Sequence, residues 1–177
     1  MELKGSKTEK NLWEAFAGES QARNKYTYWA SQAKKEGYEQ IAGIFLETAE
    51  HEKEHAKRAF KFLNMISDTP ENLRWAAEGE NFEWTDMYKR MAQEAREEGF
   101  DEIAYFFEET AEVEEEHEKR FLALLENIKQ DRVFKRDTEV KWKCRNCGYV
   151  HTGKEAPEKC PACAHPQAHY ELYCENY

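Results

Sequence analysis

Proline, cysteine and long apolar segments are scarce over most of this sequence. Only one of the four prolines, Pro70, lies in the first 150 residues, and all five cysteines follow residue 143. No apolar run approaches the roughly 20 residues that span a bilayer. The N-terminal segment 1–11 is charged, whereas a signal peptide would have an apolar stretch there. We therefore expect a cytoplasmic protein with no membrane partner.

Positive charge is also in short supply. The chain carries 26 Lys and Arg against 36 Asp and Glu, a formal net charge of −10. A surface with this excess of negative charge repels the phosphate backbone of nucleic acids and anionic lipids. We expect no nucleic-acid partner. Hydrophobic residues make up 40% of the 177 residues, which is enough for a sizeable core.

The composition changes abruptly near residue 137. Residues 138–177 hold five Lys or Arg and five Glu, so the whole net charge of −10 lies in residues 1–137. The cysteines and three of the four prolines also fall in the C-terminal segment. Such a change marks a domain boundary. We predict one domain over residues 1–137 and a second, smaller one over 138–177.

The first domain is predicted to be mainly α-helical. Apolar residues recur at steps of three and four, which predicts helices over 8–36, 38–66, 70–98 and 100–130. Gly37 and Gly99 are expected to cap the preceding helices, and Thr69 before Pro70 suits an N-cap. Four helices of about 40 Å, at roughly 1.5 Å per residue, fit a four-helix bundle.

Two Glu-x-x-His motifs, 62 residues apart, interrupt the apolar stripes of the second and fourth helices. They are Glu52 with His55 and Glu114 with His117, and each lies in a near-copy of the same segment. A single such motif in so charged a chain would usually be exposed surface. Two copies at matched positions of a repeat, on the stripe that faces a bundle core, indicate metal ligands instead.

The other two helices add carboxylates to this site. Glu19 and Glu80 occupy matching positions, but three residues later the symmetry fails, with Ala22 in the first half and Glu83 in the second. Burying five carboxylates without cations would cost several kcal/mol per ion. Carboxylate and imidazole ligands suit iron or manganese. One Glu from each of two helices plus a Glu-x-x-His from each of the others is the ferritin-like di-iron pattern.

Two further features of the chain bear on this interpretation. Tyr26 and Tyr88 follow Glu19 and Glu80 by one to two turns, so they are either core aromatics or hydrogen-bond donors to the ligands.

The C-terminal segment holds two Cys-x-x-Cys pairs with 12 residues between them, which predict a tetrathiolate site for zinc or for one iron. These pairs are Cys144, Cys147, Cys160 and Cys163. Cys174 is expected to be a small buried side chain.

The whole chain resembles the rubrerythrins, a family with a ferritin-like di-iron bundle followed by a rubredoxin-like domain. The motifs that carry the resemblance are Ala-Gly-Glu19, Gly-Glu80-x-x-Glu83, both Glu-x-x-His motifs and Cys-Pro-Ala-Cys-Ala-His-Pro at 160–166. Only Ala164 departs from free-standing rubredoxins, where a glycine is common. The resemblance implies two irons in the bundle and one iron on the four cysteines. It implies that Glu52 and Glu114 bridge the irons, that Glu19, Glu80, His55 and His117 are terminal ligands, and that Glu83 replaces His55 on oxidation.

The resemblance further implies reduction of hydrogen peroxide to water. The electrons would come from an NAD(P)H-dependent reductase or a rubredoxin, and the protein would be a homodimer in which one chain's rubredoxin-like domain faces the other chain's bundle. Three alternatives stay open from the sequence. They are iron oxidation and storage, oxygen activation on an organic substrate, and a non-enzymatic regulator with zinc on the cysteines.

Overall fold

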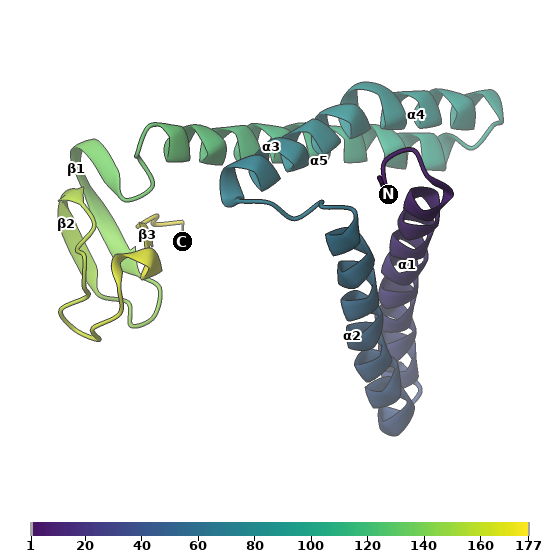
Figure 1. Cartoon of the computed structure of the whole chain (residues 1–177), viewed down its shortest axis with the longest axis horizontal. Coiled ribbons are helices and arrows are strands. Elements are labelled where there is room, and N and C mark those ends of the chain that lie inside the picture. The colour runs from purple at the N-terminus through teal and green to yellow at the C-terminus, as the bar shows by residue number, and fades with distance from the viewer. Residues whose placement is uncertain (1, 177) are drawn as a thin grey trace. The chain divides into compact units, whose positions relative to one another are not determined.

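The computed structural model describes residues 2–176, and it divides the chain into two compact units between Asp68 and Thr69. The first unit is a hairpin of two helices, α1 (Lys7–Lys35) and α2 (Glu39–Phe62), which lie side by side (Figure 1). The Ser6 hydroxyl starts α1 by accepting the Glu9 N–H at 3.1 Å. This is a side-chain cap for one of the unpaired donors of the first turn.

Small residues face the neighbouring helix within this hairpin. Ala30 and Ala33 on α1 pack against Ala42 on α2, and all three are buried. The larger apolar side chains of α2 are divided: Phe45 packs against this cluster, whereas Ile41 is 47% exposed. The same holds on the fourth predicted helix, where Ala104 is fully buried and Ile103 is 47% exposed. Buried alanines therefore let the helices of a pair approach closely, and in the first pair aromatic rings add to the contact, with Phe16 on α1 stacked 4.6 Å from Phe60 on α2.

The predicted glycine caps are confirmed. Gly37 has a φ of 84°, and the Tyr38 N–H donates to the Ala33 carbonyl at 2.9 Å. Gly99 has a φ of 85°, and the Phe100 N–H donates to the Ala95 carbonyl at 2.8 Å. This pattern satisfies carbonyls at the helix end and needs a left-handed residue, which glycine adopts without steric cost.

The second helix ends earlier than the sequence predicted. We expected it to run to residue 66, but α2 ends at Phe62 and Asn64 adopts a φ of 56°. The Met65 N–H then donates to the Phe60 carbonyl at 3.2 Å, as in the glycine caps. Asparagine is one of the few residues with a side chain that enters the left-handed region readily, and it terminates the helix here.

The third predicted helix is not a continuous α-helix. It comprises α3 (Thr69–Phe82), a π-helical turn η1 (Glu83–Met87) and α4 (Tyr88–Glu97), followed by α5 (Asp101–Lys129). In the π turn the Tyr88 N–H donates to the Glu83 carbonyl, five residues back. The prediction of one α-helix over 70–98 was therefore wrong at this turn, where one additional residue is accommodated. Both α3 and α4 pack along α5 (Figure 1).

The C-terminal segment forms a three-stranded antiparallel sheet with strand order β2-β1-β3. The strands are β1 (Lys135–Cys144), β2 (Val150–Glu155) and β3 (Tyr170–Leu172), and a short 3-10 helix η2 (Gln167–His169) precedes β3. Their core consists of buried residues of this segment alone: Trp142, Cys144, Ala156, Cys160 and Tyr170. The predicted domain boundary at 137/138 stays a prediction. Among the described residues, none of the helices combines the length and apolar character needed to cross a bilayer.

Candidate metal centres

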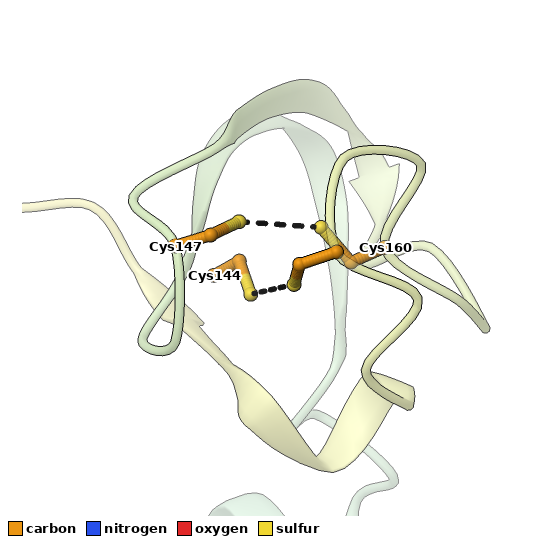
Figure 2. Close-up of side chains that lie close together, drawn as sticks. Cys144, Cys147 and Cys160 are labelled. Atoms are coloured by element: carbon orange, nitrogen blue, oxygen red, sulfur yellow. Dashed lines mark hydrogen bonds between the residues drawn. The ribbon is translucent and has the colours of Figure 1, made fainter.

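The four predicted cysteines of the C-terminal segment come together at one point. Figure 2 shows the sulfurs of Cys144, Cys147 and Cys160 turned toward a common centre. The Cys144 and Cys163 sulfurs are 3.7 Å apart, and so are those of Cys147 and Cys160. Four sulfurs in a tetrahedron, each about 2.3 Å from one ion as in zinc tetrathiolates, lie about 3.8 Å apart. The donor set therefore fits a single tetrahedral metal ion.

Two similar turns hold the cysteines in place. The Gly148 N–H donates to the Cys144 carbonyl, and the Ala164 N–H donates to the Cys160 carbonyl, each at 2.8 Å. Gly148 has a φ of 80° and Ala164 has a φ of 61°. An L-residue in this region costs roughly 1–2 kcal/mol. The alanine that departs from the rubredoxin pattern thus adopts the conformation that glycine adopts in the first turn.

The thiols of this site differ in acidity. The backbone N–H of His165 lowers the pKa of Cys163 to about 6. The Tyr149 N–H favours the Cys147 thiolate, but the sulfurs of Cys163 and Cys160, together with burial, outweigh it and raise the pKa of Cys147 to about 12. The four sulfurs cannot all ionise at neutral pH without a cation, so metal binding must drive the last protons off.

The first unit brings three predicted ligands together, and we call them the first ligand set. Glu19 comes from α1, and Glu52 and His55 come from α2. The His55 Nδ1 atom lies 2.8 Å from a Glu52 oxygen and 3.8 Å from a Glu19 oxygen. Burial, followed by the adjacent Glu52, raises the pKa of Glu19. A bound cation would favour the charged form of both carboxylates and so offset this repulsion.

The second unit repeats this geometry in the second ligand set. Glu80 comes from α3, and Glu114 and His117 come from α5. The His117 Nδ1 atom lies 2.6 Å from a Glu114 oxygen and 3.9 Å from a Glu80 oxygen. In each set the possible ligand atoms lie within 4.8 Å of one another. Each unit therefore offers two carboxylates and one imidazole to a metal ion.

Glu83 lies beside the second ligand set, at the start of the π turn. Burial, followed by the charge of Glu114, raises the pKa of Glu83. Burial and then the charges of Glu114 and Glu83 raise the pKa of Glu80. The negative charges of these carboxylates therefore repel one another, which places Glu83 among the second set's electrostatic neighbours.

The two tyrosines differ in their surroundings. Their rings pack alike, with Tyr26 6.0 Å from Phe45 and Tyr88 6.0 Å from Phe107. Burial, and then the nearby negative charges of Glu83 and the second ligand set, raise the pKa of Tyr88. Tyr88 is therefore a neighbour of the carboxylates, and the ring of Tyr26 also contacts Trp29 at 5.6 Å.

Two features of this site escaped the sequence prediction. Glu118, next to His117, accepts hydrogen bonds from Trp84 Nε1 at 2.5 Å and from Asn81 Nδ2 at 3.1 Å, and so ties α3 and the π turn to α5. Nothing distinguishes Glu118 from its many acidic neighbours in sequence. The π turn does leave a signal, because the repeat spacing is 61 residues from Glu19 to Glu80 but 62 from Tyr26 to Tyr88.

The expectation for Cys174 was wrong. This cysteine is exposed, because it follows the last strand, β3, in the C-terminal tail and has no core to enter. It also lies outside the group of cysteines that could hold a metal ion.

Comparison with known proteins identifies the family. The family model for rubrerythrin matches residues 10–125 and 71–146, and the model for the rubrerythrin rubredoxin-like domain matches residues 142–171. The chain belongs to the rubrerythrin family. It is 60% identical to a rubrerythrin of Porphyromonas gingivalis, over 99% of this chain and 94% of that one. It is 56% identical to a rubrerythrin of Nitratidesulfovibrio vulgaris, over 99% of this chain and 98% of that one.

Solved structures of nigerythrin are also similar to the chain. One of them, in its fully reduced, all-ferrous state, is 32% identical with a TM-score of 0.37, over 97% of this chain and 91% of that one. Membership of the rubrerythrin family confirms the predicted fold class, a ferritin-like four-helix bundle followed by a small rubredoxin-like domain. It also confirms the cofactors, which are a di-iron site and one iron on the four cysteines.

Replacing Glu83 with glutamine should stabilise the metal-free protein at neutral pH. Because the folded-state pKa of Glu83 is raised, its protonated form favours folding. That contribution is present below the unfolded pKa of about 4.3 and is lost as the pH rises through the folded value. Glutamine removes the charge. Urea unfolding in the presence of a chelator should therefore give Glu83→Gln a larger free energy of unfolding than wild type near pH 7. The difference between the two proteins should shrink toward pH 4.

The control for this prediction is Glu112→Gln, which neutralises an exposed glutamate of α5 outside both ligand sets. Its stability difference from wild type should be small and should not follow the same pH profile. A Glu83→Gln protein that is less stable than wild type at neutral pH would show that the charge of Glu83 is favourably solvated, contrary to this expectation.

Proposed function

We propose that this protein is a non-haem di-iron peroxidase that reduces hydrogen peroxide to water with electrons delivered through the rubredoxin-like iron. The observation that carries the proposal is the presence, in a single chain, of two matched carboxylate–imidazole sets and a tetrathiolate site. An iron-storage protein needs the first kind of site but not the second. A peroxidase needs a supply of electrons, and an iron on the tetrathiolate site can pass them on one at a time.

The roles proposed for the ligands are those that the family resemblance implies. Reduction of one peroxide consumes two electrons and two protons, and a pair of ferrous ions supplies the two electrons. We propose that Glu52 and Glu114 bridge the two irons and that Glu19 and Glu80 bind one iron each. His55 and His117 complete the ligands, one per iron.

We propose that Glu83 acts as an exchangeable ligand for the iron that His55 binds in the reduced protein. A neutral imidazole suits a ferrous ion and an anionic carboxylate suits a ferric ion. The raised pKa of Glu83 also lets it hold a proton more readily than an ordinary glutamate, and peroxide reduction consumes protons. Tyr88, beside Glu83, can orient that carboxylate through its hydroxyl, and we propose the same role for Tyr26 toward Glu19.

The electron donor and the assembly belong to the same proposal. We propose that an NAD(P)H-dependent reductase or a rubredoxin reduces the tetrathiolate iron, and that the protein is a homodimer in which this domain faces the partner's bundle. A cytoplasmic location suits it, because its five cysteines are all free of disulfides, and thiols stay reduced in that compartment.

A ferroxidase that oxidises ferrous iron for storage is the second candidate, because it shares the ferritin-like ligand pattern. The choice of oxidant separates the two. We expect fully reduced protein to be reoxidised by hydrogen peroxide much faster than by air, with one peroxide consumed per two electrons. Stopped-flow spectroscopy at matched oxidant concentrations measures both rates. An equal or faster reaction with dioxygen would favour the ferroxidase.

A further inference from the structure

Tyr170 carries a buried hydroxyl group beside the tetrathiolate site. It is the first residue of β3, it is 4% exposed, and it packs in one cluster with Cys144, Cys160 and Trp142. Within residues 2–176, its Oη atom is buried and forms no hydrogen bond. A phenylalanine would fill the same space without burying a polar atom, so packing does not account for the hydroxyl.

The Cys160 sulfur, in the same buried cluster, is the candidate acceptor for this hydroxyl. Burial, and then the Cys160 side chain, raise the pKa of Tyr170, although the hydroxyl and the sulfur do not meet the geometry of a hydrogen bond. A neutral thiol is a weak acceptor. A metal-bound thiolate is charged, and hydrogen bonds to charged acceptors are shorter and stronger. A phenol keeps its proton at neutral pH, since its ordinary pKa is about 10. A metal-bound thiolate carries no proton, so in a hydrogen bond between the two groups the phenol is the donor.

We propose that the Tyr170 hydroxyl donates a hydrogen bond to the Cys160 sulfur of the iron-loaded site and thereby raises the reduction potential of that iron. The proposal deepens the electron-delivery part of the proposed function and rests on it for its consequence in turnover. Tyr170 is a positioning and tuning residue, because it acts on the iron through Cys160.

The sign of the effect follows from charge. Four thiolates around a ferric ion carry a net charge of −1, and the same ligands around a ferrous ion carry −2. A hydrogen-bond donor stabilises the more negative state more strongly, so it favours reduction. Hydrogen bonds to the sulfurs are among the factors that set the potentials of iron–sulfur sites. A higher potential makes this iron easier to reduce.

Tyr170→Phe tests the proposal because it removes one oxygen atom and keeps the ring. Spectroelectrochemical titration, which follows the thiolate-to-iron charge-transfer bands in the visible spectrum, should show reduction disfavoured by about three- to tenfold, a potential lower by roughly 30–60 mV for one electron. The matched control is Tyr149→Phe, which removes a hydroxyl from a half-buried ring packed against the same core. Its potential should stay within about 20 mV of wild type, roughly a twofold change.

A second variant should shift the reduction potential of this iron in the opposite direction. Site-specific 3-fluorotyrosine at position 170 has a more acidic hydroxyl, which is a stronger donor, and should raise the potential above wild type. An unchanged or higher potential in Tyr170→Phe, or no rise with the fluorinated residue, would overturn the proposal. None of these titrations involves peroxide, so a negative peroxidase assay would count against the proposed function and leave this inference standing.

Discussion

Cys160→Ser is expected to yield a protein without red colour and without reductase-driven peroxide turnover. The Cys160 sulfur lies 3.7 Å from that of Cys147 in the tetrathiolate group. With three thiolates left, we expect the site to lose its iron and with it the thiolate-to-iron charge-transfer bands. The helices should stay folded, because the core of the strand segment consists of its own residues. Circular dichroism, iron content and the visible spectrum measure the three expectations together.

The matched control is Cys174→Ser, which removes an exposed cysteine outside the metal-binding group. It should keep both colour and turnover. Chemically reduced Cys160→Ser should still react once with peroxide, since its di-iron ligands are intact. A red Cys160→Ser protein, or a colourless wild type with one zinc per chain, would contradict iron delivery through this site.

Glu83→Ala is expected to bind two ferrous ions nearly normally and yet to slow peroxide turnover by at least about tenfold, the lower end of what ligand-supporting residues contribute. Four carboxylates balance the +4 charge of two ferrous ions. Two ferric ions carry +6, and the fifth carboxylate changes the ligand charge from −4 to −5. Removing it destabilises the oxidised state and raises the di-iron reduction potential. His55→Ala should instead weaken ferrous binding.

A control matched in charge is Glu94→Ala, which removes a surface glutamate of α4 that pairs with Arg90. Its potentials and its rate of reoxidation by peroxide should match wild type. If Glu83→Ala also matches wild type in both measurements, Glu83 is a bystander and the ligand exchange with His55 does not operate in this protein.

Local signals made the helix pairs and the cysteine site predictable. Gly37 and Gly99 were assigned as caps from sequence because only a left-handed residue completes those helix ends. The cysteine spacing indicated a single metal because two short pairs on facing turns bring four sulfurs together. Asn64 went unrecognised as a helix end because asparagine is also common in other settings, and only its φ of 56° distinguishes it.

Features that depend on tertiary packing were less accessible. Cys174 was expected to be buried because cysteine usually is, but the tail after β3 offers no core. The contact of Glu118 with Trp84 depends on the relative rotation of α5 and the π turn, which hydrophobic periodicity does not specify. The orphaned hydroxyl of Tyr170 is likewise visible only once the strand core is assembled.

Glu83, at the start of the π turn, makes the two halves of this duplicated protein inequivalent. If position 83 carried alanine, as position 22 does, the two helix pairs would present equivalent ligands, and an electron shared by the two irons would have no preferred place. Glu83 has no counterpart at Ala22, so the added negative charge favours the ferric state on one iron only. The half-oxidised protein is therefore expected to have trapped valences, with the same iron always oxidised first.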